Sequence, residues 1–145
     1  AYLQFDVSNV PLYPHADLLK RRAISEPERY PQAGEPNAMV RLCVTPASGG
    51  VTRWLNLGDT QNQYLIARVG WIPNSSDLWV QRATRVQNRL ELLRVNPATG
   101  EPQALLSESD PHWINLADDF RFLEGGNKFL WSSERDGFRH LYLYT

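Results

Sequence analysis

The residues of this chain best suited to binding a ligand are arginines, two adjacent acids and a tryptophan. Arg82 and Arg85 flank an expected hairpin tip, and a guanidinium can bind a carboxylate through two parallel hydrogen bonds. Asp118 and Asp119 could hold the amine of a ligand, and Trp113 precedes them in the same stretch. We therefore predict these five residues as candidates for lining a substrate cavity. The alternatives are surface ion pairs for the arginines, a solvated loop for the acids and packing between sheets for Trp113.

Signals for catalysis and for metal binding are weak. The sequence has no Gly-x-Ser-x-Gly turn of the kind that carries a serine nucleophile, and it has no phosphate-binding glycine loop. His15, His112 and His140 are far apart, and only His112 has a nearby acid, Asp110. Cys43 is the only cysteine, and its apolar neighbours predict a buried, inert thiol. We expect no catalytic residue, no metal and no cofactor in this chain.

Composition is typical of a soluble β-rich domain. The 145 residues carry a net charge of −1, so the overall charge gives no reason to expect binding to nucleic acid or to an anionic membrane. No apolar run reaches the roughly 18 residues that a membrane span needs, and no secretory leader is evident. The 42% hydrophobic and 11% aromatic content is sufficient for a packed core and favours strands.

The short apolar segments that would position the candidate residues as strands recur along the chain at a regular spacing. A shift of 51 residues aligns Trp71 with Phe122, 78–80 with 129–131, and Leu90 and Leu92 with Leu141 and Leu143. A shift of 50 aligns Val40 and Leu42 with Leu90 and Leu92. A period near 50 built from short alternating strands is typical of a β-propeller. An antiparallel sandwich is the alternative, but its strands need not recur in order.

The predicted fold is therefore all-β, with antiparallel four-stranded blades that form part of a β-propeller. Residues 1–57 form an incomplete blade with a long proline-rich insertion at about 7–38, and residues 58–107 form a complete blade. Its four strands are expected at 64–71, 78–83, 88–95 and 103–106. Residues 108–145 form a second incomplete blade. Because three such units cannot close a ring, we expect a piece of a larger protein. Its open sheet edges should make it self-associate or leave it only marginally stable.

The order of strands in a blade predicts which loops lie together. Hairpins alternate between the two faces of a propeller, so loops between second and third strands share a face with the connections between blades. Residues 7–38, 84–88, 107–119 and 134–138 should therefore lie on one face. We expect any site to lie there, because loops held by a rigid scaffold commonly carry function.

Four motifs resemble the dipeptidyl peptidase IV family, particularly its bacterial members. Residues 29–37 (Arg-Tyr-Pro-Gln-Ala-Gly-Glu-Pro-Asn) are similar to a family segment that has lysine where this chain has Gln32. Phe5-Asp6 followed by Val10-Pro11 resembles the stretch before it, and residues 85–88 resemble a family hairpin with asparagine in place of Thr84. Residues 131–142 resemble the bacterial version closely. The motifs occur in the family's order and cover essentially the whole chain.

This resemblance implies a parent serine exopeptidase that removes X-Pro or X-Ala dipeptides from peptide N-termini. In that family an eight-bladed propeller covers an α/β-hydrolase domain that carries the catalytic triad, so no catalytic residue of the family maps onto this chain. Paired glutamates that bind the substrate amine would precede Ala1. The 7–38 insertion corresponds to an arm that reaches a second subunit, which implies a homodimer, although a disordered loop is the alternative.

The resemblance also implies a periplasmic or secreted parent that acts on peptides. This chain would then be a non-catalytic segment that contributes to substrate access and dimerisation. Two other functions remain open from the sequence. One is a stand-alone β-propeller module that binds proteins or peptides without peptidase activity. The other is a hydrolase of the prolyl oligopeptidase group with a different specificity.

Overall fold

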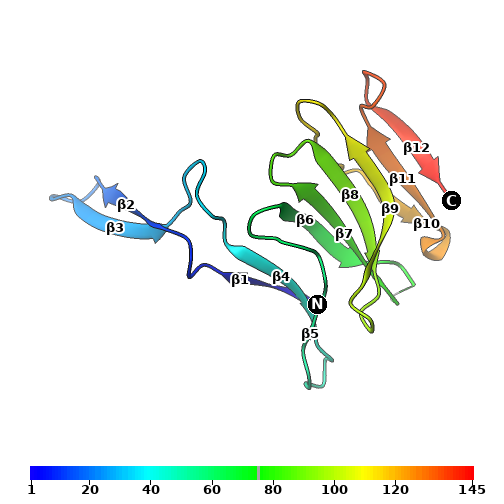
Figure 1. Ribbon diagram of the computed structural model, residues 1–145, viewed down its shortest axis with the longest axis horizontal. Helices are drawn as coiled ribbons and strands as arrows, with labels where there is room; N and C mark the ends of the chain where they lie inside the picture. The colour runs from blue at the N-terminus through cyan, green and yellow to red at the C-terminus, as the bar shows by residue number, and fades with distance from the viewer. Residues whose placement is uncertain (75) are drawn as a thin grey trace.

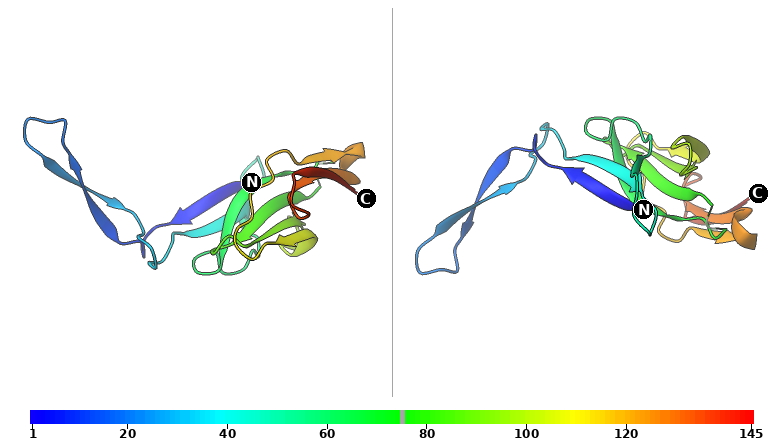
Figure 2. Two further views of the ribbon diagram at one scale, coloured as in Figure 1. Left: turned by 90° about the horizontal axis from the view of Figure 1, so that it is seen from above. Right: turned by 90° about the horizontal axis from the view of Figure 1, so that it is seen from below.

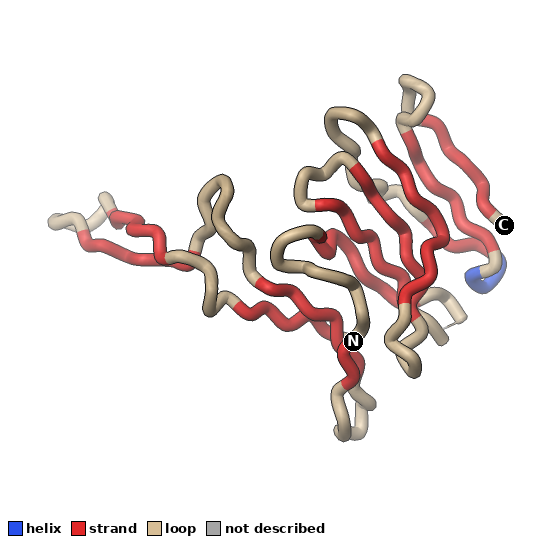
Figure 3. Tube along the Cα trace, viewed as in Figure 1, coloured by secondary structure: helices blue, strands red, loops and turns tan. Residues whose placement is uncertain are grey.

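The computed structural model describes residues 1–74 and 76–145, and nearly all of its regular structure is strand (Figures 1 and 3). Short turns connect most neighbouring strands. The one helical element among the described residues is a 3-10 turn, η1 (Glu124–Gly126). The strands are β1 (Tyr2–Asp6), β2 (Leu12–Asp17), β3 (Ile24–Arg29), β4 (Met39–Val44), β5 (Arg53–Trp54), β6 (Tyr64–Trp71), β7 (Leu78–Thr84), β8 (Arg89–Val95), β9 (Pro102–Ser109), β10 (Arg121–Leu123), β11 (Lys128–Ser133) and β12 (His140–Tyr144).

The strands form three successive antiparallel sheets and one separate hairpin. The sheet orders are β1-β4-β5, β6-β7-β8-β9 and β10-β11-β12, and β2 pairs with β3 alone. The 50-residue repeat places β4 on β8, so the first sheet corresponds to the second, third and fourth strands of a blade. The last sheet corresponds to the first three strands. This all-β, unclosed arrangement is a partial propeller; the blade boundaries at 57 and 107 stay predictions.

Two hydrophobic clusters hold the three sheets together face to face. The first lies between the first two sheets, and the second lies between the last two sheets and includes the fully buried Trp131. Burying a Leu- or Phe-sized side chain contributes about 1.5–3 kcal/mol. The buried members of the two clusters are Leu42, Leu55, Leu57, Leu78, Val80, Leu93 and Val95, and then Ala83, Leu90, Leu92, Ala117, Phe120, Phe129 and Trp131.

The sheets differ in detail from the sequence expectations. The strand expected at 51–57 shortens to β5, two residues long, and β9 extends past the expected 103–106. The turn expected at 124–127 contains η1. The extended insertion contains the β2–β3 hairpin, whose two strands pair along their length, so the disordered loop given as its alternative does not form.

The β2–β3 hairpin, here called the arm, projects away from the three sheets (Figures 1 and 2). Its base is fixed by Arg29, whose Nη1 donates to the carbonyl of Val10 at 2.7 Å and to that of Ser8 at 3.1 Å. At its tip, Leu18 and Leu19 are almost entirely exposed. The arm is therefore ordered by its own backbone ladder and by its base, and most of its side chains face solvent.

Candidate functional site

Three loops meet on one face of the sheets, as the blade order predicts. The β7–β8 hairpin contacts the β9–β10 connection, since the backbone N–H of Ile114 donates to Gln87 O at 2.9 Å. The N–H of Asp110 likewise donates to Asn88 O at 2.9 Å. In Figure 1 these loops and the β11–β12 hairpin lie at the upper end of the sheets, and the turn at 96–101 and η1 lie at the lower end.

A cleft of about 520 Å³, here called the loop-face cleft, opens between these three loops. It contains three of the five candidate residues, Trp113, Asp118 and Asp119. The remaining lining residues come from all three loops: Gln87, Ile114, Asn115, Leu116, Glu134 and Arg139. A smaller cavity of about 70 Å³ adjoins it and shares Trp113. The face is thus concave, and both acids and bases line it.

Trp113 borders the cleft with 54% of its surface exposed, so the alternative that it packs between sheets is wrong. Its neighbours Ile114 and Leu116 take that role, because both pack against the second hydrophobic cluster. An exposed indole anchored by buried neighbours offers a flat apolar surface to a ligand.

Each of the two candidate acids faces an arginine. Asp118 is 3.2 Å from Arg68, and Asp119 is 3.3 Å from Arg139. All four side chains are about half exposed, so each pair contributes about 1 kcal/mol or less to stability. Pairs this weak can exchange partners when a charged ligand arrives.

Arg85 ties the β7–β8 hairpin to the base of the arm. Its side chain donates to the carbonyl of Glu35 and, at 3.4 Å, to that of Gln61. Its backbone N–H donates to Gln63 O at 2.8 Å. Arg85 therefore connects the loop face to the arm, and its role at a substrate cavity stays a prediction.

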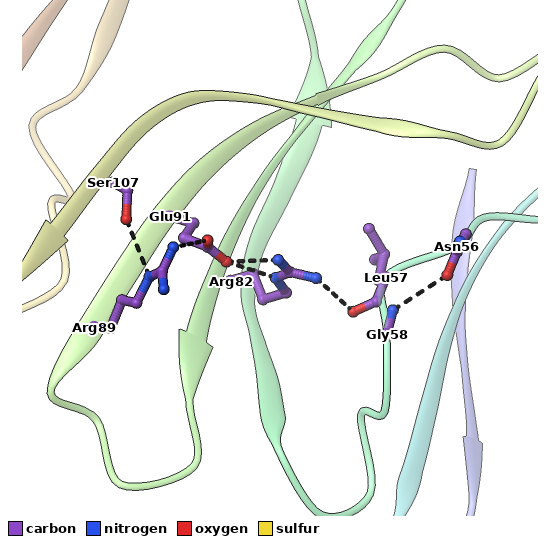
Figure 4. A network of polar contacts seen from close by, with 7 residues as sticks. All are labelled: Asn56, Leu57, Gly58, Arg82, Arg89, Glu91 and Ser107. Atoms are coloured by element: carbon purple, nitrogen blue, oxygen red, sulfur yellow. Dashed lines mark hydrogen bonds and ion pairs between the residues drawn. The ribbon is translucent and has the colours of Figure 1, made fainter.

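Arg82 lies within β7 and takes part in a largely buried network (Figure 4). Its Nε and Nη2 donate to Glu91 Oε2 at 2.9 and 2.6 Å, and its Nη1 donates to Leu57 O at 2.9 Å. Arg89 donates to the other oxygen of Glu91 at 2.9 Å. The guanidinium also lies 4.0 Å from the ring centroid of Tyr64. This geometry favours the ion pair over a carboxylate site, and Arg82 lines neither cavity on the loop face.

The loop face also contains polar residues that the sequence reasoning did not single out. Asn115 donates to Glu134 at 2.8 Å and so joins the β9–β10 connection to the β11–β12 hairpin. Arg135 is 2.6 Å from Glu108, which also accepts from the Trp131 indole at 3.1 Å. The sequence could have indicated these residues, because they lie in or next to the loops that were predicted to share one face.

The histidines stand apart, each near one carboxylate: His15 near Glu28 at 3.8 Å, His112 near Asp110 at 3.7 Å and His140 near Asp136 at 3.3 Å. Within residues 1–74 and 76–145, no group of three or more His, Cys, Asp or Glu side chains could hold a metal ion. Cys43 is buried, and burial raises the pKa of its thiol. In the same described ranges, no helix is long and apolar enough to cross a membrane.

Comparison with known proteins gives a consistent result. The family described as the dipeptidyl peptidase IV N-terminal region matches residues 1–145. A structure described as a dipeptidyl aminopeptidase IV from Bacteroides ovatus superimposes with a TM-score of 0.84 and 31% identity, covering 99% of this chain. Porphyromonas gingivalis dipeptidyl peptidase 4 superimposes with a TM-score of 0.83 and 29% identity over 98% of this chain.

This chain spans 20% of the length of each of those two solved structures. The match nevertheless includes every part described above, from the arm to the β11–β12 hairpin. The repeat, the three sheets and the four sequence motifs agree with it. The chain belongs to the dipeptidyl peptidase IV N-terminal region family.

Proposed function

We propose that this chain is a non-catalytic propeller segment of a serine exopeptidase that removes X-Pro or X-Ala dipeptides from peptide N-termini. The observation that carries the proposal is the family match over residues 1–145. Peptide bond cleavage itself would use a hydrolase domain of the same protein. The chain's own contribution is to shape the route by which peptides reach that domain.

The loop-face cleft is the part of this chain that we assign to substrate access. Trp113 offers an apolar surface, and Asp118 and Asp119 offer carboxylates that can exchange an arginine for a cationic group of a peptide. These groups would select extended chains over bulky folded ones. Rigid walls that exclude water and large substrates contribute to catalysis through access and not through chemistry.

The arm is the part that we assign to dimerisation. Its exposed apolar side chains include Leu18, Leu19 and Ile24, which are 79%, 98% and 48% exposed. Prolines at positions 14 and 27 stiffen its two strands, so less conformational entropy is lost when the arm docks. A second copy of the parent enzyme would cover these side chains. We also place the parent in the periplasm or outside the cell, and cell fractionation tests that placement.

Kinetics of the full-length protein test the role in substrate access. We expect Trp113→Ala to raise KM for a ten-residue Xaa-Pro peptide about tenfold, with kcat nearly unchanged, because uniform binding is lost. A small chromogenic Ala-Pro substrate should be affected much less, because on this proposal only a longer peptide extends from the catalytic site to the loop face. Trp54→Ala replaces an equally exposed tryptophan of the first sheet and serves as the control. Equal effects on both substrates would contradict the assignment.

The same assay separates the proposed enzyme from a binding module. A full-length protein that binds Xaa-Pro peptides but releases no dipeptide would contradict the exopeptidase proposal. It would support the stand-alone binding module in its place. Release of single amino acids or internal cleavage would indicate a related hydrolase of different specificity.

A further inference from the structure

A second cleft lies between the sheets on the side of their first strands. Its volume is about 360 Å³, and its lining comes from β6, β7, β10 and the segment just before β10. It shares only Asp118 with the loop-face cleft. Its volume falls at the lower end of the range for small-ligand sites. The residues that carry the argument are Arg68, Trp71, Trp79, Gln81, Asp118 and Arg121.

Gln81 supplies a buried hydrogen-bond acceptor at this cleft. Its side chain is 1% exposed, and its Nε2 donates to the carbonyl of Ala117 at 2.8 Å. Its Oε1 has no hydrogen-bond partner among the described residues. Exchanging the amide nitrogen and oxygen would not help, because Ala117 O requires a donor. A buried amide oxygen of this kind requires a hydrogen-bond donor, which an ordered water or an N–H or O–H group of a ligand can supply.

Aromatic rings form a rigid wall beside Gln81. The Trp79 ring lies directly over Gly70, where an added Cβ would be only 2.7 Å from its atoms. Phe120 packs edge-on against Trp79, with ring centroids 4.8 Å apart. Trp71, 43% exposed, stands at the mouth. Flat rings held in this way suit a pyrrolidine or an aromatic side chain.

The cleft also carries charges of both signs. Arg121 is exposed, and its guanidinium makes no hydrogen bond or ion pair within the part of the chain that the structure describes. Arg68 and Asp118 form the half-exposed pair at 3.2 Å. A free guanidinium is a site for a carboxylate. Asp118 and the Gln81 oxygen are sites for an ammonium group.

We propose that this β6–β10 cleft binds zwitterionic dipeptides whose second residue is proline or an aromatic residue. The ligand's carboxylate lies on Arg121, its ring lies against Trp71 and Trp79, and its ammonium group donates to Gln81 Oε1 and Asp118. The proposal goes beyond peptide access at the loop face. It rests on the proposed function only in that an Xaa-Pro dipeptide is what such an enzyme releases.

Calorimetric titration of the full-length protein with Ala-Pro, after its catalytic serine has been blocked covalently with a fluorophosphonate, tests the proposal. We expect saturable binding with one dipeptide per chain. N-acetyl-Ala-Pro-amide, which has the same ring but neither charge, should bind at least tenfold more weakly. Arg121→Gln should weaken Ala-Pro binding at least tenfold, whereas Arg22→Gln, an exposed arginine on the arm, should leave it unchanged.

Two further outcomes would overturn the proposal. One is the absence of saturable Ala-Pro binding by a folded chain, checked by its near-ultraviolet circular dichroism. The other is binding that Arg121→Gln leaves intact but Trp113→Ala abolishes, which would move the dipeptide to the loop face. The titration involves no hydrolysis, so a failed peptidase assay with retained Ala-Pro binding would contradict only the proposed function.

Discussion

Arg82 illustrates how a candidate binding residue becomes a structural one through its cross-strand neighbour. Arg82 and Glu91 are directly opposite in the β7–β8 register, and their side chains are 13% and 9% exposed. A charge buried this far needs its partner, because removing the partner leaves an uncompensated charge away from water. Leu57 O and Arg89 complete the network (Figure 4).

We therefore expect Glu91→Gln to lower the free energy of unfolding by about 3–5 kcal/mol, since Arg82 loses its buried counter-charge. Glu101→Gln, at an exposed turn of the same sheet, should change it by about 0.5 kcal/mol or less. Urea denaturation followed by tryptophan fluorescence measures both. A loss under 1 kcal/mol for Glu91→Gln would show that the network contributes little.

A second residue-scale effect concerns the β11–β12 hairpin. The Tyr142 hydroxyl donates to Asp136 at 2.8 Å, and this hydrogen bond is the main reason that the pKa of Asp136 is lowered from 3.8. The same bond raises the pKa of Tyr142. A carboxyl whose pKa is lower in the folded state stabilises that state above its unfolded pKa. The stabilisation is lost as pH falls through the folded pKa.

We expect the hairpin to keep this stabilisation at neutral pH and to lose it below about pH 4. Tyr142→Phe should bring the pKa of Asp136 back toward 3.8. An NMR titration of the carboxyl carbon measures the pKa. Asp110 is the internal control, because its pKa is lowered by the backbone N–H groups of His112 and Trp113 and not by Tyr142. An unchanged pKa in Tyr142→Phe would assign the shift to another group.

At the scale of elements, alternation and turn residues were sufficient to predict β6 and β11 with their observed bounds. The arm was harder because its strands contain prolines, which sequence rules read as evidence against a strand. Pro14 and Pro27 lie opposite each other in an isolated two-stranded ladder. Both strands there are edges, so a missing N–H is tolerated where it would face solvent.

The sequence predicted the face on which the candidate site lies but not the contacts within it. Blade order placed the loops of Trp113, Asp118 and Asp119 on one face, because strand topology determines that property. The partners of these residues were not predictable from one sequence. Arg68 and Asp118 are 50 residues apart in the chain, and only the packing of one sheet on the next brings them together.

The close contact between Gly70 of β6 and the Trp79 ring leads to a further prediction. Gly70 leaves room for the Trp79 ring, so we expect Gly70→Ala to displace that ring and to destabilise the fold by about 1–3 kcal/mol. Near-ultraviolet circular dichroism and thermal unfolding report the two effects. Ala104→Val, on the exposed side of β9, adds carbon atoms without meeting a ring and is the control. An unchanged tryptophan signal in Gly70→Ala would contradict the assigned packing.

At the scale of the whole molecule, the sheets and the arm are separable parts. The three sheets share two hydrophobic clusters, and neither cluster contains a residue of β2 or β3. The two ends of the arm are held together at its base, where Arg29 donates to Val10 O and the N–H of Tyr30 donates to Pro11 O at 3.1 Å. Arg85 links this base to the sheets through the carbonyl of Glu35. Stability and assembly should therefore respond differently to changes in the arm.

We expect replacement of residues 12–29 by a short Gly-Ser linker to leave the free energy of unfolding of the sheets within about 1 kcal/mol, because long surface segments contribute little to it. The same change in the full-length protein should convert a dimer into a monomer, as measured by light scattering. Substituting Leu18 and Leu19 with serine keeps the hairpin and tests its apolar tip alone. A full-length protein that remains dimeric without the arm would contradict its role in assembly. Loss of the sheets' stability on the same deletion would instead show that the arm belongs to their fold.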